Sequence, residues 1–419
     1  MPLLSSMAKY HARVVKPAFS LRSFPRTLGS QLIFVFLCGL IVFLRMPDRL
    51  LNAQFYAEDG FFFEQALSHG LNTLITPYGG YLLTVQRLIT LLGTQVKPLY
   101  VPLLFNGLTL VVLFTVLFRL LSSRVKLTYK PLLALALVAY PHPEDLFLTM
   151  ENTMWVLSLV LLIMLFSDDP KTIWESLGDY VFIVLSGLTG VFSFLFVPLF
   201  IFKAYLRRSK KSIISAILVG LTAVTQVYFI ITAPKVQALD LSPVEFGYIP
   251  AIFGYRFVMH LLGGIKFIPL SVGTLTAIGV LSCIGIAVLV FMKGLNFKER
   301  MMRVILAFVM GITAAASLFR LKHSLPMLVS GEPLARYMFL PQVALIWLIA
   351  QELSFPGLRR RIAIIFFTLF FITSLTYFKK EPLKDMHWKE TSKKVIAGSY
   401  YDILINPVGW HFRSENSGL

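Results

Sequence analysis

The sequence predicts an all-α polytopic membrane protein with about 11 transmembrane or re-entrant helices. Hydrophobic residues make up 57% of the 419 residues, and the mean hydropathy is +0.75. Apolar runs of roughly 17 to 23 residues recur along the chain, which is the length that a helix needs to cross the hydrocarbon core. Short basic clusters separate these runs. Membrane topology therefore explains the net charge of +18, and nucleic-acid binding is not predicted.

The first helix is expected at 29–45, behind a cytoplasmic basic N-terminus, residues 1–28. This segment holds Lys9, Arg13, Lys16, Arg22 and Arg26. Because no Ala-x-Ala-like site follows the apolar run, an uncleaved signal anchor with its basic end in the cytoplasm is predicted. The later basic clusters can all be placed on that same side, at 119–130, 203–211, 293–303 and 359–361.

The other predicted helices follow the remaining apolar runs. They are 99–121, 131–141, 152–167, 212–233, 268–292, 303–319, 336–354 and 362–378. The stretch 179–202 is too short for two crossings at about 1.5 Å per residue, yet cytoplasmic segments adjoin both of its ends. A re-entrant pair of half-helices, broken near Gly187 to Gly190 and Pro198, is predicted. The alternative is one ordinary crossing that inverts the later topology.

This topology leaves five segments on the outer face, and most of the acids lie in them. The segments are 46–98, 142–151, 234–267, 320–335 and 379–419. The first is expected to form amphipathic juxtamembrane helices around Phe61 to Phe63, followed by a turn at 77–81. A membrane domain thus spans 29–378. The periplasmic C-terminal tail, 379–419, is too short for an independent domain and is expected to pack over the outer loops.

Glu58 and Asp59 stand side by side in the first outer loop, in a chain with only 21 Asp plus Glu. Just outside the bilayer, where a lipid-linked substrate presents its headgroup, such a pair has the position and charge of a general base. The alternative is a helix N-cap in which Asp59 accepts free backbone N–H groups. Both interpretations can hold together, since capping fixes a carboxylate in place.

Glu151 comes directly before Asn152 and four residues before Trp155, so that Glu151 and Trp155 share one helix face. An acid beside an aromatic ring can bind sugar hydroxyls while the ring stacks on the pyranose. The alternative is a helix-start acid favoured by the helix dipole, above an interfacial tryptophan.

Outward basic residues are the candidates for binding a phosphate. Arg336 is the best of them because it opens the helix 336–354, where a guanidinium can grip a lipid phosphate at headgroup depth. The others are Arg87, Arg256, His260, Lys322 and His323. For each of them the alternative is contact with ordinary lipid phosphates.

No metal or other cofactor is predicted. His142, His260 and His323 have no ligand-like spacing, and Cys38 and Cys283 lie inside apolar runs. A Walker A sequence, a Rossmann fingerprint and a nucleophile elbow are missing from the sequence, so nucleotide-driven work and acyl transfer are unsupported. Hydrolysis of a glycoside stays open, since a second carboxylate could come from Glu144, Asp145 or Glu151.

The order of these features resembles the GT-C glycosyltransferases, and more narrowly the bacterial and phage-encoded O-antigen glucosyltransferases that convert serotype. The matching segments are Tyr56-Ala57-Glu58-Asp59-Gly60, Pro77-Tyr78-Gly79-Gly80-Tyr81, Gln86-Arg87, Glu151-Asn152 with Trp155, Gly187 to Phe192 followed by Pro198, Arg336-Tyr337 ahead of Pro341, and the tail from Ala397-Gly398 to Trp410. Each motif is short, while their order relative to the helices is more specific.

The resemblance implies an enzyme of the bacterial inner membrane whose active site faces the periplasm. It would transfer a hexose, glucose in the narrower family, from a polyprenyl-phosphate sugar to a lipid-linked O-antigen or another surface glycan. The family's base is an acid of the first outer loop, which maps onto Asp59 or Glu58, with Asp59 favoured. Tyr81 and Tyr337 join the sugar and acceptor candidates. Membrane lipid, the lipid-linked donor and the glycan acceptor are the implied partners, with a functional link to a donor flippase and a donor synthase.

The rival interpretation is a transporter or flippase of lipid-linked sugar. Transporters usually carry ionisable residues near the middle of the bilayer and often have repeated halves. The mid-helix polar residues here are mostly the uncharged Asn106, Gln226 and Gln342, and no internal repeat is detected. Transfer is therefore favoured over transport.

Overall fold

The computed structural model describes residues 27–141, 146–233, 246–263, 270–329, 334–395 and 400–414. The chain is mostly helical, and five helices in the described part are long and apolar enough to cross a membrane, as expected of a multi-pass membrane protein. These spans are Leu28–Arg45 (α2), Pro98–Leu121 (the turn Pro98–Tyr100, η2, with α6, Val101–Leu121), Lys210–Thr232 (α11), Val272–Phe291 (α13) and Phe297–Arg320 (α14). The basic residues predicted from Lys9 to Arg26, the residues His142, Glu144 and Asp145, and the pair Ala397-Gly398 lie outside the described residues.

Shorter apolar helices form the centre of the molecule. They are α7 (Lys130–Val138), α8 (Thr153–Leu165) and α15 (Phe339–Glu352). The longer α16 (Leu358–Thr376) has many exposed apolar side chains. Nearly every side chain of α8 and α15 is buried, as expected of helices that are apolar all round. The helix predicted at 131–141 is shorter than expected, because α7 ends at Val138.

The stretch predicted as a broken pair forms two helices, α9 (Ile173–Gly187) and α10 (Phe192–Arg207). The break falls at 188–191, where the Gly190 N–H donates to the Leu82 carbonyl at 2.9 Å. The first half of α9 and the end of α10 lie at one polar cluster. Asp179 of α9 binds Arg124, Arg207 of α10 binds Asp168, and Arg124 also donates to the Asp168 carbonyl. The prediction of a break near Gly187 to Gly190 is confirmed, whereas Pro198 lies inside α10.

Part of the segment 234–267, which was predicted to face outward and for which no helix was predicted, is helical. Residues Ile249–Phe253 form α12, which continues as the π-helix η4 (Gly254–Gly263) after the short turn η3 (Phe246–Tyr248). Arg256 and His260 interrupt the apolar run, so a hydropathy window of transmembrane length misses it.

Two glycines let α12 and α13 touch backbone to backbone. A Cβ at Gly254 would stand 2.0 Å from the Leu275 carbonyl oxygen, and one at Gly279 would stand 1.8 Å from the Pro250 oxygen. Such close approach through small residues is a common way to pack helices in membranes.

Gly279→Ala is expected to lower the free energy of unfolding by about 1–3 kcal/mol, because the added methyl must push the two backbones apart. Thermal unfolding in detergent measures this. Gly285→Ala is the matched control, since nothing lies within 4 Å of a Cβ there. Equal melting temperatures for the two variants would contradict the packing.

The first outer loop contains the short helices predicted for it. They are α3 (Asp48–Leu51), α4 (Glu58–His69), the turn η1 (Gly70–Ile75) and α5 (Thr84–Gly93). Of the phenylalanines around which a membrane-surface helix was predicted, Phe61 is exposed, but Phe62 and Phe63 are 1% exposed and pack in the protein core, so that part of the prediction is wrong. Leu51, Leu71 and Ile75 expose most of their apolar side chains.

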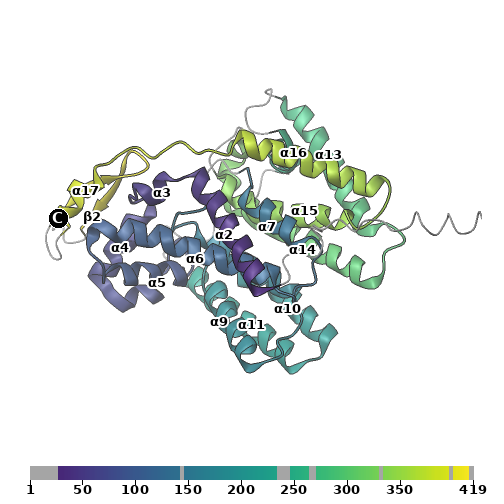
Figure 1. The fold of residues 1–419 in the computed structure, drawn as a ribbon, viewed down its shortest axis with the longest axis horizontal. Coiled ribbons are helices and arrows are strands. Elements are labelled where there is room, and N and C mark those ends of the chain that lie inside the picture. The colour runs from purple at the N-terminus through teal and green to yellow at the C-terminus, as the bar shows by residue number, and fades with distance from the viewer. Residues whose placement is uncertain are drawn as a thin grey trace, which may run out of the picture.

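The C-terminal tail corrects the all-α prediction. After α17 (Trp388–Thr391) and η7 (Ser392–Lys394), the strands β1 (Asp402–Ile405) and β2 (Trp410–Arg413) pair antiparallel. Two features indicated this hairpin and were overlooked. The side chains of β1 alternate between exposed and buried, and Gly409, with φ of +96°, lies between the strands. The hairpin packs on α4, at the end of the molecule that carries α3, α4, α5 and α17 (Figure 1).

The predicted outer segments meet one another in the structure. The Glu151 N–H contacts Asp59, the tail residue Asn406 pairs with Tyr56, and the Lys380 N–H donates to the Arg45 carbonyl. Parts of the segments 46–98, 142–151 and 379–419, far apart in sequence, thus contact one another or the end of α2.

The predicted inner basic clusters also meet, through a separate set of ion pairs. Arg124 binds Asp179, which lies buried near the start of α9. Arg303 and Arg359 both bind the buried Glu352, which ties α14, α15 and α16 together. The grouping of loops into two sets therefore agrees with the charge pattern.

Candidate functional site

The acid pair begins α4. Ala57 precedes it with φ of +46° and ψ of −121°, a sharp change of chain direction, and Glu58 and Asp59 occupy the first turn. Helix N-termini carry free N–H groups and a partial positive charge, so two acids are stabilised there.

Asp59 faces inward. It is 2% exposed, and its Oδ1 accepts the Glu151 N–H at 3.3 Å, while a second backbone hydrogen bond joins it to Tyr56. Burial raises the pKa of Asp59 to about 7, although the charge of Arg49 acts to lower it. The prediction that Asp59 is the helix N-cap is wrong, because Ala57 is the N-cap of α4 and makes no side-chain capping bond. The two backbone N–H groups that the Asp59 carboxylate binds, from Tyr56 and Glu151, lie outside α4.

Glu58 is the more accessible acid, and it is half-buried. Its Oε1 accepts the hydroxyl of Tyr78 at 3.2 Å, and its side chain is hydrogen-bonded to Glu151. Burial, reinforced by Glu58 and Asp59, raises the pKa of Glu151 well above its ordinary value. A hydrogen bond therefore joins the Glu58 and Glu151 carboxyl groups.

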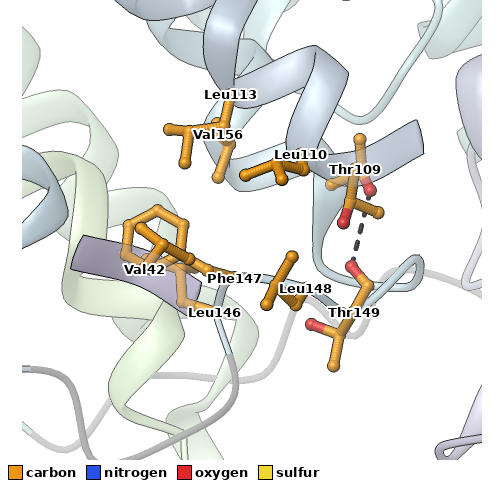
Figure 2. A pocket seen from close by; sticks show the side chains of 10 residues that line it. Val42, Thr109, Leu110, Leu113, Leu146, Phe147, Leu148, Thr149 and Val156 are labelled. Carbon is orange, nitrogen blue, oxygen red and sulfur yellow. Dashed lines mark hydrogen bonds between the residues drawn. The ribbon is translucent and has the colours of Figure 1, made fainter. Parts of the chain in front are cut away.

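Glu151 is held firmly by its neighbours. Gln86 donates to its backbone carbonyl at 3.2 Å, and Asn152 donates to its Oε1 at 3.0 Å. The preceding residues, 146–149, line a small pocket together with side chains of α2, α6 and α8 (Figure 2). Its volume is about 10 Å³, so this segment is packed almost without space.

A large apolar cavity is lined in part by the turn Gly79–Tyr81, next to Tyr78, whose hydroxyl binds Glu58. Its volume is about 640 Å³, and α10, α11 and α14 form its walls. Trp155 and Tyr337 line it with their rings 5.1 Å apart, and the Trp155 Nε1–H is buried without a hydrogen-bond partner among the described residues. A cavity of this size and composition suits an apolar ligand with a polar end.

The polar end of the cavity is formed by the turn Gly79–Tyr81 and by Arg320, the last residue of α14. An Nη atom of Arg320 lies 3.8 Å from the position of a Cβ on Gly79. Burial raises the pKa of Tyr81 to about 12, and the charges of Arg320, Arg336 and Glu58 all act on its phenol. The turn thus connects the cavity to the acid cluster.

Most of the predicted site residues come together here. Arg336, in the turn η6 (Ala335–Met338), acts on both Glu151 and Tyr81. The cluster consists of Glu58, Asp59, Tyr81, Glu151, Asn152, Trp155, Arg336 and Tyr337. Within the described part of the chain, no group of three or more His, Cys, Asp or Glu side chains could hold a metal ion.

Other phosphate candidates lie elsewhere. Arg87 is fully buried with its guanidinium 4.6 Å from the ring centre of Phe62. Lys322 and the exposed His323 belong to the turn η5 (Lys322–Leu328) and do not line the cavity.

Arg256 and His260 also lie away from the cavity. The Arg256 Nε donates to the Leu328 carbonyl at 2.8 Å, and the Nδ1 of His260 lies 3.2 Å from the amide nitrogen of Gln342. Both side chains are buried, so their contacts indicate a structural role.

Sequence reasoning missed Arg320, Tyr78 and Arg49. Arg320 lies one residue beyond the predicted helix 303–319, where a basic residue at the outer end of an apolar run was the available signal. Tyr78 belongs to the turn that was already singled out. Nothing in the sequence indicates the charge of Arg49 acting on Asp59.

Comparisons of the chain with protein-family models, with curated proteins and with solved structures find no match.

Replacing Arg49 by Met is expected to raise the pKa of Asp59 further, by about one unit, because an opposite charge that favours the carboxylate is removed. The carboxyl stretching band that disappears in Asp59→Asn reports this titration by infrared spectroscopy, with a midpoint near pH 7 in the wild type. Since burial raises the folded pKa, the stability contributed by the protonated acid is lost as the pH rises towards 7. Arg49→Lys is the control, and a midpoint that Arg49→Met leaves unchanged would contradict the coupling.

Proposed function

We propose that the protein transfers a hexose, most simply glucose, from a polyprenyl-phosphate sugar to a lipid-linked O-antigen or another surface glycan. The reaction is placed at the periplasmic face of a bacterial inner membrane. The GT-C-like order of motifs supports the superfamily, the glucosyl donor and this location.

One observation carries the proposal. The turn Tyr78–Tyr81 joins the acid cluster at the start of α4 to an apolar cavity of about 640 Å³, because Tyr78 binds Glu58 and the residues Gly79 to Tyr81 line the cavity. Enzymes that act on a lipid-linked sugar need an apolar groove for the chain and a charged group at its end. Here both occur beside a carboxylate.

The donor is proposed to place its prenyl chain between α10, α11 and α14, with its phosphate at Arg320. A guanidinium binds phosphate oxygens through two parallel hydrogen bonds. Arg336, the stronger candidate from sequence, acts on Glu151 and Tyr81. We therefore assign it to the sugar side of the site and Arg320 to the phosphate side.

Glu58 is the proposed general base. A base must reach the proton that it removes, and Glu58 is half-buried whereas Asp59 is 2% exposed. Glu58 thus replaces Asp59, the acid favoured from the sequence, as the proposed base. Asp59 does have a pKa of about 7, which suits a general base. Asp59 positions the backbone of Glu151.

The chemistry balances with these groups. The acceptor hydroxyl gives its proton to Glu58 as its oxygen forms a bond to the anomeric carbon. The bond from that carbon to the phosphate oxygen breaks, and polyprenyl phosphate leaves with the bonding electrons. Arg320 stabilises the charge on the leaving phosphate. Trp155 and Tyr337 are placed to stack on the sugar.

A photoreactive polyprenyl-phosphate hexose tests the donor site. We expect it to label α11 and α14, where Ile231 and Ala316 line the cavity, and we expect unmodified polyprenyl phosphate to compete. Ala316→Trp should reduce labelling by filling the cavity, whereas Phe308→Trp, on the exposed side of α14, should not. Labelling outside the cavity, unaffected by either change, would contradict the site.

A further inference from the structure

The C-terminal hairpin reaches the residues that lead into the acid pair. The Ala57 N–H donates to the Asn406 carbonyl at 2.5 Å, and the Asn406 N–H donates to the Phe55 carbonyl at 3.2 Å. Tyr56 and Asn406 form a parallel β-bridge. The segment 55–57 therefore pairs through its backbone with a residue about 350 positions later in the chain.

Side chains reinforce this pairing. Phe412 is fully buried, with its ring 5.2 Å from that of Phe55 and 5.9 Å from that of Phe63. A Cβ on Gly60 would stand 3.0 Å from the Cδ1 of Ile405 and 3.1 Å from the Cβ of Phe412. The hairpin thus lies directly on the first turn of α4.

The pairing matters because it binds Ala57, whose backbone conformation is unusual. Ala57 has φ of +46°, a region that residues with a Cβ rarely occupy unless their surroundings impose it. Its N–H is bound by the hairpin, and the next residue is Glu58. The direction in which Glu58 leaves the chain depends on the Ala57 conformation.

We propose that the C-terminal hairpin is a positioning element that holds Ala57 in this conformation and so aims Glu58 at the cavity end of the site. The effect on catalysis rests on the proposed function, whereas the structural coupling does not. The C-terminal tail then contributes to the geometry of the active site in addition to packing over the outer loops.

A matched pair of substitutions in β1 tests the proposal in the full-length protein. Ile403 is 3% exposed and points inward, while its neighbour Leu404 is 51% exposed and points outward. Ile403→Asp should unseat the hairpin, and Leu404→Asp should not. Hydrogen exchange measured on peptides covering 55–60 should become about tenfold faster in Ile403→Asp only.

We expect the variant with faster hydrogen exchange, Ile403→Asp, to lose turnover as well. A displaced base lowers kcat by about a hundredfold, while KM for the donor stays the same because the cavity is untouched. A merely structural role would lower the amount of folded protein and leave kcat per folded molecule unchanged. The folded fraction is counted by size-exclusion chromatography in detergent.

A milder pair covers the case in which Ile403→Asp does not fold. Tyr401 hydrogen-bonds Glu64 of α4, whereas Tyr400 is 67% exposed. Tyr401→Phe should give faster exchange at 55–60 and a smaller loss of kcat, and Tyr400→Phe should give neither. Unchanged exchange at 55–60 with a displaced hairpin, or a loss of turnover without faster exchange, overturns the proposal. If wild type transfers no sugar, the proposed function fails, and the exchange data still decide the coupling.

Discussion

Glu58→Gln is expected to lower kcat about 10²–10⁴-fold, the range that a general base contributes. The amide keeps the shape of the side chain and can still contact Tyr78 and Glu151, but it cannot take the proton of the acceptor hydroxyl. Donor binding should remain, because the cavity and Arg320 are unchanged. Single-turnover transfer from a labelled donor, with donor affinity measured separately, gives both quantities.

Two neighbouring acids are the controls for this result. Asp59→Asn keeps a carbonyl oxygen that can accept the Glu151 N–H, and Glu151→Gln keeps a hydrogen-bond donor to Glu58. Both should lose less turnover than Glu58→Gln. A complete loss in Asp59→Asn together with an active Glu58→Gln would return the role of base to Asp59.

Arg320→Gln is expected to raise KM for the polyprenyl-phosphate donor about 10- to 100-fold, since a hydrogen bond to a charged group contributes about 1.5–3 kcal/mol. The loss should also make binding less sensitive to salt, because one charge–charge contact is removed. Titration of the donor at two ionic strengths measures both effects.

The opposite end of α14 provides the matched control. Arg300 is exposed near the start of the same helix, away from the cavity. Arg300→Gln should leave KM unchanged, and Arg336→Gln should lower kcat more than it raises KM. Equal KM values for wild type and Arg320→Gln would remove Arg320 from the phosphate site.

The features that hydropathy and charge determine were predictable. Apolar runs located α2, α6, α11, α13 and α14, because the hydrocarbon core fixes the length of a spanning helix. The break at 188–191 was predictable for two reasons. The flanking charges left too few residues for two full crossings, and the glycines marked the position at which the helix would break. The acid pair and Glu151 were found because carboxylates are costly near a bilayer and therefore scarce.

Features that depend on distant partners were not predictable. The pairing of Asn406 with Tyr56 has no local signal, and the strands of the hairpin are only four residues long. The helix from Ile249 to Gly263 was missed because Arg256 and His260 interrupt its apolar run. The hydrogen bond of Arg256 to the Leu328 carbonyl depends on tertiary structure and has no signal in the local sequence.

The choice between Glu58 and Asp59 was also beyond the sequence. Adjacent residues on a helix point in different directions, and which one is buried depends on the elements that pack against α4. The hairpin and Glu151 both contact α4.

Reconstitution of the purified protein with labelled polyprenyl-phosphate glucose and a lipid-linked glycan acceptor tests the central claim most directly. We expect the label to become covalently attached to the acceptor with release of polyprenyl phosphate, and to remain on the donor when Glu58→Gln replaces the wild type. Passage of the labelled donor across the bilayer with no covalent product would contradict the account and identify a transporter.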